Sequence, residues 1–138
     1  MLSDVEVSLR AWREDGKAIT SNCFLGLFSM IDQSQYQVAG LDEDETATLV
    51  TVCNLSIDQF GGVFDKMHEK FAVSLITFSR ALDRMSVDDF ARFRADGGFI
   101  DVLVTITVES DEVELTFPAE FIEQIGRLRL PLEIMSTE

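Results

Sequence analysis

The residues of this chain that could take part in catalysis are few: one histidine, His68, and two cysteines, Cys23 and Cys53. His68 is followed by Glu69, as in the zinc-protease motif, but that motif needs a second histidine four residues after the first. Ala72 stands at that position, so two ligands on one helical face are missing. We therefore predict no metal site at His68, and we interpret it as a surface residue of a helix.

Nucleophilic catalysis by a cysteine needs a neighbouring base that lowers the pKa of the thiol. Only His68 could be that base, and both cysteines stand between apolar residues without a glycine-rich or basic surrounding. We interpret Cys23 and Cys53 as buried thiols, which fits a reducing compartment better than a disulfide. The sequence also has no phosphate-binding glycine loop and no serine flanked by glycines. It thus predicts a protein that is not an enzyme and holds no cofactor.

A run of four carboxylates could bind a hard cation, because calcium takes several carboxylate oxygens. This acidic tetrad consists of Asp42, Glu43, Asp44 and Glu45. An EF-hand loop that began at Asp42 would need glycine at its sixth position and glutamate at its twelfth, where Ala47 and Cys53 stand. The match fails, so the tetrad is either a solvated turn or part of a surface that binds a partner.

The distribution of charge favours the partner surface. The net charge is −14, and no lysine or arginine occurs between Lys17 and Lys66 or between Arg94 and Arg127. The second interval contains the acidic hairpin group, which consists of Glu109, Asp111, Glu112 and Glu114. If the tetrad and this group lie at the same end of a sheet, their joint negative field would speed association with a basic protein. The same charge argues against direct binding of nucleic acid.

The elements that must position these groups are clearest in the last third of the chain. After Gly97 and Gly98, apolar and polar residues alternate, which predicts a half-buried strand. Its apolar positions are Ile100, Val102, Val104, Ile106 and Val108. The alternation resumes at Val113, Leu115 and Phe117, which predicts the antiparallel return arm of a hairpin.

A helix and a last strand are expected to follow this hairpin. Pro118 suits the first turn of a helix, and Gly126 is expected to end it. The helical face would consist of Phe121, Ile122, Ile125 and Leu128. Leu128, Leu130, Leu132 and Ile134 then alternate with polar residues, and Pro131 favours an edge position for that strand.

The first half of the chain predicts mainly strands. Residues 5–11 alternate as a strand, Asp15-Gly16 is a frequent turn pair, and residues 17–21 could be the returning arm. Residues 23–32 fit a helix behind an Asn22 cap, although a strand remains open. Residues 36–41 and 46–55 are interpreted as two strands around the acidic tetrad.

Helical periodicity begins at Asp58 and continues to Met85. The apolar stripe consists of Phe60, Phe64, Met67, Phe71, Leu75, Phe78, Leu82 and Met85. Ser86 with Asp89 predicts a capped second helix through Phe90 and Phe93. This order of elements predicts one α+β domain, residues 1–138, with a mainly antiparallel sheet and helices on one face.

The sequence shows no signal peptide and no apolar run long enough for a membrane span, which predicts a soluble cytoplasmic protein. Three segments resemble a bacterial family of small α+β domains of unknown function: residues 8–10, residues 117–122 and residues 128–134. Some members of that family look like immunity proteins of secreted toxin systems. The resemblance implies a bacterial protein that inhibits a toxin.

Charge and resemblance together favour a non-enzymatic, acidic immunity protein that neutralises a cognate toxin by covering a basic surface. One alternative is a small-molecule-binding or regulatory domain with an apolar pocket under the long helix, lined by phenylalanine and methionine. Another is an acidic inhibitor of phage type, whose target would be an enzyme that acts on nucleic acid.

Overall fold

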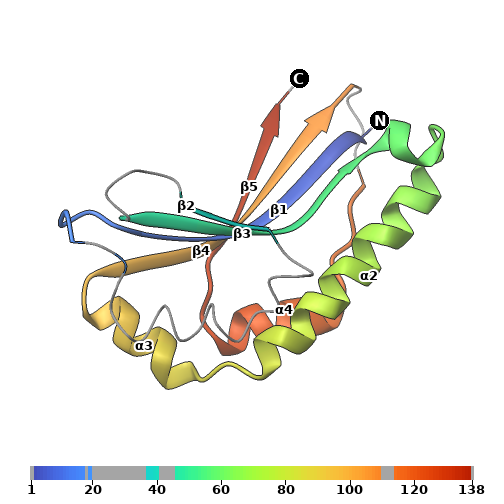
Figure 1. Ribbon diagram of the computed structural model, residues 1–138. Coiled ribbons are helices and arrows are strands. Elements are labelled where there is room, and N and C mark those ends of the chain that lie inside the picture. Colours follow the sequence, from blue (N-terminus) through green and yellow to red (C-terminus); the bar gives the residue numbers. More distant parts are fainter. Residues whose placement is uncertain (1, 18, 20–36, 41–45, 110–113, 138) are drawn as a thin grey trace.

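The computed structural model describes residues 2–17, 19, 37–40, 46–109 and 114–137 of the 138-residue chain (Figure 1). The strands are β1 (Leu2–Arg13), β2 (Gln37–Gly40), β3 (Ala47–Ser56), β4 (Gly98–Val108) and β5 (Leu132–Thr137). The helices are the 3-10 turn η1 (Ile57–Phe60), α2 (Phe64–Asp83), α3 (Val87–Ala95) and α4 (Ala119–Arg127). Of the helices in these ranges, none is long and apolar enough to cross a membrane.

The strands form one five-stranded sheet in the order β2-β3-β1-β4-β5. β1 lies in the centre and pairs antiparallel with β3 and with β4, while β5 pairs parallel with β4. In Figure 1 the three α-helices lie on one side of this sheet. We call that side the helix-side face and the other the open face. The predicted α+β class, with a mainly antiparallel sheet and helices on one face, is confirmed.

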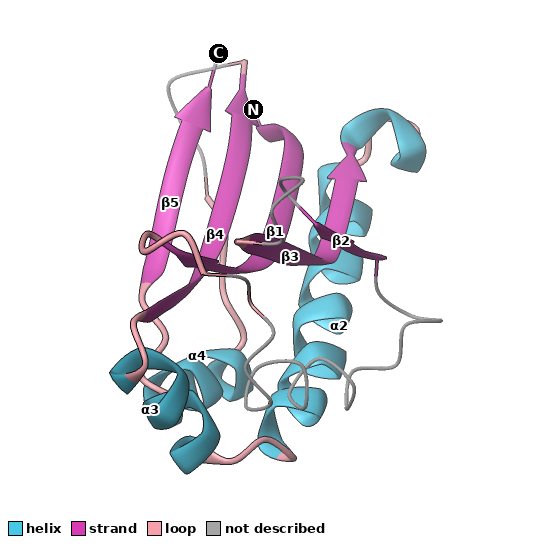
Figure 2. Ribbon diagram, turned by 60° about the vertical axis from the view of Figure 1, so that its left-hand side comes forward, coloured by secondary structure: helices cyan, strands magenta, loops and turns pink. Residues whose placement is uncertain are grey.

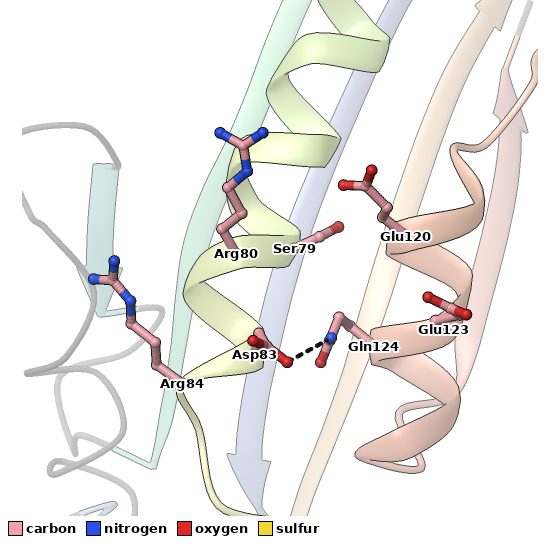
Figure 3. A pocket seen from close by; sticks show the side chains of 7 residues that line it. All are labelled: Ser79, Arg80, Asp83, Arg84, Glu120, Glu123 and Gln124. Carbon is pink, nitrogen blue, oxygen red and sulfur yellow. Dashed lines mark hydrogen bonds between the residues drawn. The ribbon is translucent and has the colours of Figure 1, made fainter.

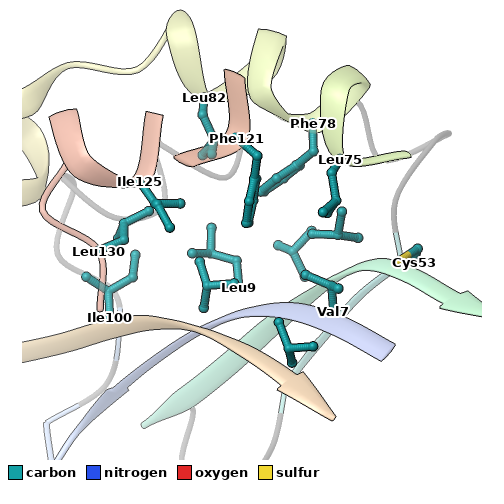
Figure 4. Close-up of a cluster of buried hydrophobic side chains, with 14 of the residues drawn as sticks. Val7, Leu9, Cys53, Leu75, Phe78, Leu82, Ile100, Phe121, Ile125 and Leu130 are labelled. Carbon is teal, nitrogen blue, oxygen red and sulfur yellow. The ribbon is translucent and has the colours of Figure 1, made fainter. Parts of the chain in front are cut away.

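The core lies between the helix-side face and the helices (Figure 4). Val7 and Leu9 of β1 are buried beneath Leu75 and Phe78 of α2, and α4 adds Phe121. The α2 stripe predicted from the sequence is buried: Met67, Phe71, Leu75, Phe78 and Leu82 have exposed fractions of at most 1%. Alternation in the strands and a spacing of three and four in the helix place these side chains in one layer.

The long helix begins later than the sequence pattern predicts. Phe60 belongs to η1, and α2 starts only at Phe64. Between them Gly61 and Gly62 have φ angles of 62° and 78°, a left-handed conformation that glycine adopts without steric cost. The apolar spacing runs through this break because Phe60 still packs against the same core.

The capped second helix is confirmed as α3. The Ser86 hydroxyl accepts a hydrogen bond of 3.2 Å from the Asp88 N–H. Asp89, which was expected to take part in this cap, pairs with Arg92 one turn later instead. At the far end of α3 the chain enters β4 through Gly98, where a Cβ atom would come within 2.3 Å of the Phe93 ring. Only glycine leaves room for that ring to be buried.

The return arm of a hairpin after β4 was a wrong prediction. Residues 114–118 form no strand, and the neighbour of β4 on its outer side is β5, in parallel orientation. Phe117 contacts the rings of Phe71 on α2 and Phe121 on α4, so its apolar side chain is used against helices. The period-two pattern is the same for an extended segment that packs on a helix, and it does not identify the pairing partner.

The last strand begins at Leu132, four residues after the predicted start. Leu128 and Leu130 are buried in the turn that follows α4, where Arg129 has a φ of 55° and the Leu130 N–H donates to the Ile125 carbonyl at 2.8 Å. That arrangement ends α4 after Arg127, one residue beyond Gly126. The expected edge position of the strand is confirmed, with Pro131 directly before it.

In the first half, the strands expected at residues 5–11, 36–41 and 46–55 correspond to β1, β2 and β3. The helix expected at residues 23–32 lies outside the described residues, and so does most of the arm expected at residues 17–21.

Removal of a core side chain of α2 tests this packing. We expect Leu75→Ala to lower the free energy of unfolding by about 2–5 kcal/mol, because it leaves a cavity beneath the helix. Val73 on the outer side of α2 is 50% exposed, so Val73→Ala should change it by less than about 0.5 kcal/mol. Urea denaturation measures both values, and equal effects would contradict the arrangement of α2.

Candidate partner-binding surfaces

Most of the predicted acidic surface lies outside the described residues. The acidic tetrad, Asp42, Glu43, Asp44 and Glu45, belongs to that part of the chain, as do Asp111 and Glu112. Of the hairpin group, Glu109 and Glu114 are described. Both are exposed, and neither forms an ion pair with the rest of the described chain.

The residues next to the two acidic groups lie at opposite ends of the sheet. The strand residues nearest the tetrad in the chain are Gly40 and Ala47, and Ala47 pairs with Trp12 near the end of β1. Glu109 follows Val108, which pairs with Leu2 at the start of β1. Ten residues of strand span about 33 Å. This exceeds the Debye length of about 8 Å at physiological ionic strength, so we treat the two groups as separate candidate surfaces.

Several arginines are held by the protein itself. The Arg10 guanidinium on β1 binds Asp101 of β4 with two hydrogen bonds of 2.9 and 2.6 Å. It also donates to Glu133 of β5 at 3.1 Å. The hydrogen bonds with Asp101 are the largest cause of a raised pKa of Arg10. This triad joins three neighbouring strands on the open face.

Arg13, at the end of β1, is engaged more fully. Its side chain is 2% exposed and binds both carboxylate oxygens of Asp15, at 3.1 and 2.7 Å. It also binds the Asp96 carboxylate at 2.8 Å and the Asp96 carbonyl at 2.5 Å. Hydrogen bonding by Arg13, followed by the backbone N–H of Lys17, lowers the pKa of Asp15 well below its ordinary range. The cluster joins β1 to the end of α3.

Two further arginines donate to backbone carbonyls near helix ends. Arg94 binds the carbonyls of Leu128 and Arg129 at 2.6 and 2.8 Å, which ties α3 to the turn after α4. Arg127 binds the carbonyls of Leu82 and Met85 at 2.7 and 3.1 Å, which ties α4 to the end of α2. Carbonyls in the last turn of a helix lack intrahelical partners, so these positions favour a cation.

Many carboxylates remain without such a partner. In the described part of the chain no ion pair is formed by Asp4, Glu6, Glu14, Asp58, Asp65, Glu69, Asp83, Asp88, Glu109, Glu114, Glu120 and Glu123. The free basic side chains are a smaller group: Lys17, Lys66, Lys70, Arg80, Arg84 and Arg129. Lys66, Lys70 and Arg80 lie on α2 and Arg84 is its C-cap residue, so the described surface away from that helix is predominantly negative.

The open face carries an aromatic pair that sequence reasoning missed. Trp12 of β1 and Phe99 of β4 are directly paired, and their rings stack with centroids 5.6 Å apart. The Arg10 guanidinium lies 5.3 Å from the Trp12 ring centroid, and Phe99 is 44% exposed. Tryptophan and arginine are enriched among the residues that dominate binding energy at protein interfaces. The sequence does contain a sign of this pair: Trp12 and Phe99 are aromatic residues at positions where the alternation of each strand would place a polar residue.

The residues considered for catalysis have structural surroundings. His68 is half-buried on α2: its Nε2 accepts a hydrogen bond of 3.2 Å from the Thr116 N–H, and its ring lies against Phe64. It holds the segment before α4 and is thus more than a solvated surface residue. Cys53 is buried, and burial raises the pKa of its thiol to about 11, so little reactive thiolate is present. Cys23 lies outside the described residues.

Within the described ranges, no three histidine, cysteine, aspartate or glutamate side chains are placed to hold a metal ion. An open groove of about 390 Å³ lies between α2 and α4 (Figure 3). It is lined by Ser79, Arg80, Asp83, Arg84, Glu120, Glu123 and Gln124, and Gln124 donates to Asp83 at 3.0 Å. The lining is charged, so the groove is not the apolar pocket considered for a small-molecule-binding domain.

No family model, no curated protein and no solved structure matches this chain.

The ion pair between Arg13 and Asp15 has a consequence for stability in acid. The pKa of Asp15 is lower in the folded state than in the unfolded state, where it is about 3.9. The carboxylate therefore stabilises the folded state fully at pH values above about 3.9, and this stabilisation is lost as the pH falls further. We expect Asp15→Asn to reduce the free energy of unfolding near neutral pH, with a difference from the wild type that shrinks below about pH 4.

Denaturation of both proteins across this pH range measures the difference. Glu14→Gln removes an exposed, unpaired carboxylate next in sequence and serves as the control. A difference for Asp15→Asn that stays constant with pH would show that the carboxylate is not held by Arg13 in the folded state.

Proposed function

We propose that this protein is a non-enzymatic, acidic domain that binds a basic protein, most concretely an immunity protein that neutralises a cognate bacterial toxin. One observation carries the proposal. The domain uses Arg10, Arg13, Arg94 and Arg127 for its own internal contacts, while most carboxylates of the described surface have no ion pair. A surface of this kind favours encounter with a positive one.

The packing of α2 argues against the apolar-ligand alternative. Phe71, Phe78 and Leu82 have exposed fractions of 0%, so their side chains are used in the core and do not line a cavity. His68 and Cys53 are likewise engaged in the fold, which supports a role in binding rather than in catalysis.

Inhibition of a toxin agrees with two observations: the negative charge of the surface and the resemblance of the sequence to a family with immunity-protein-like members. A toxin that acts on nucleic acid presents a positive cleft, because it must bind phosphates. An acidic inhibitor made in the cytoplasm of the same cell would cover that cleft by electrostatic complementarity. A phage-type inhibitor of a nucleic-acid enzyme would use the same surface against a different target. The identity of the bound enzyme distinguishes the toxin inhibitor from the phage-type inhibitor. Binding of a toxin encoded beside this gene supports the proposal.

Neutralisation of the acidic groups tests the role of charge. One variant replaces the tetrad by Asp42→Asn, Glu43→Gln, Asp44→Asn and Glu45→Gln, and a second combines Glu109→Gln with Glu114→Gln. We expect at least one variant to lower the rate of association with a toxin encoded beside this gene, and to weaken the dependence of that rate on salt. Surface plasmon resonance at low and physiological salt measures these rates.

The matched control combines Asp65→Asn with Glu69→Gln, which removes two carboxylates of α2 beside Lys66 and Lys70. Association rates that are equal for all variants at both salt concentrations would contradict electrostatic steering. If the neighbouring gene product does not bind the wild type at all, the toxin assignment fails.

The aromatic pair provides a second test of the same complex. Because truncation of an anchor mainly affects dissociation, we expect Trp12→Ala to raise the dissociation rate while the association rate changes little. Ile122→Ala on α4 removes a side chain that is 45% exposed on the other side of the sheet and serves as the control. An unchanged dissociation rate in a folded Trp12→Ala variant would place the interface elsewhere.

A further inference from the structure

The outer edge of β5 offers backbone groups that no other described strand pairs with. β5 is the last strand of the sheet and stands at its left border in Figure 2. The Pro131 carbonyl accepts a hydrogen bond of 2.8 Å from the Val102 N–H and therefore faces β4. Since successive residues of a strand alternate, Glu133 and Met135 also direct their backbone groups to β4. Leu132, Ile134 and Ser136 direct theirs outward, where no strand of the described chain lies.

This edge exposes two apolar side chains and carries a single charged residue. Ile134 and Met135, which point to opposite faces of the sheet, are 53% and 48% exposed. The single charge of the strand, Glu133, is bound by Arg10. Natural proteins usually protect an exposed edge with lysine, proline or a bulge, and β5 has none of these. An edge of this kind fits a strand without excess charge, unlike the acidic surfaces discussed above.

We propose that β5 pairs with β5 of a second copy of this chain, antiparallel around a two-fold axis at Ile134. A two-fold axis perpendicular to the sheet keeps the helices of both copies on one side and joins the two sheets into one. The outward N–H of Ile134 in each copy then donates a hydrogen bond to the Ile134 carbonyl of the other copy. Leu132 of one copy faces Ser136 of the other. On the open face Glu133 lies opposite Met135, so no two like charges face each other.

The second copy is favoured over a charged partner because the strand is self-complementary in this register. Each outward donor meets an outward acceptor, and the two exposed Ile134 side chains cover each other. Each copy carries a net charge of −14, so long-range repulsion opposes the dimer. Salt screens this repulsion, and the dimer should therefore become tighter as salt increases, opposite to the binding of a basic protein.

Sedimentation velocity over a wide range of protein concentration tests the pairing. We expect a monomer–dimer equilibrium that shifts toward dimer between about 0.05 M and about 0.5 M sodium chloride. Ile134→Pro removes the outward N–H, which no strand of the described residues pairs with, and should abolish the dimer. Ile122→Ser removes a similarly exposed apolar side chain from α4 and should leave it intact.

A second variant keeps the test valid if Ile134→Pro does not fold. Ile134→Lys retains the backbone N–H but places two like charges opposite each other at the axis, and it should weaken the dimer by about tenfold or more. Hydrogen exchange tests the register of the pairing. The outward amides of Ile134 and Ser136 should become more protected as the protein concentration rises, whereas the Met135 amide, which faces β4, should be protected at all concentrations. A chain that stays monomeric under all conditions, or a dimer that both Ile134 variants leave unchanged, would overturn the proposal.

Discussion

Burial of the helix-side face of β1 and β4 beneath α2 and α4 is the interaction on which the rest of the structure depends. Val7, Val104, Phe71 and Phe121 are all 0% exposed and belong to the same core. Burial of such side chains contributes about 1.5–3 kcal/mol each, before the loss of conformational entropy. No described helix packs on the open face and no described strand pairs with the outer edge of β5, so both can meet a partner.

Charge is the second constraint, since a chain with a net charge of −14 must fold against its own repulsion. Three of the arginines join separate elements of the fold. Arg13 ties β1 to α3, Arg94 ties α3 to the turn after α4, and Arg127 ties α4 to α2. The uncompensated carboxylates are left on the surface, and the proposed recognition of a basic protein follows from this division.

Much of the fold was predictable from local patterns, and the exceptions have physical causes. The apolar stripe of α2 and the alternation of β1 were sufficient to predict these two elements, because each pattern repeats over many residues. The alternation in residues 114–117 was not sufficient, because it indicates an extended segment but does not show what that segment packs against. Trp12 and Phe99 were overlooked as a pair, since 87 positions separate them and only their register brings the rings together.

The sequence by itself determined the α+β class, the buried stripe of α2, the buried face of β1 and the excess of negative charge. These properties depend on composition and on periodicity within one element. Only the tertiary structure decided that β5 lies parallel beside β4, that the strand ends next to the tetrad and to Glu109 lie at opposite ends of the sheet, and that Arg13 is enclosed by Asp15 and Asp96. Such contacts join residues distant in sequence, and packing of the whole core selects among them.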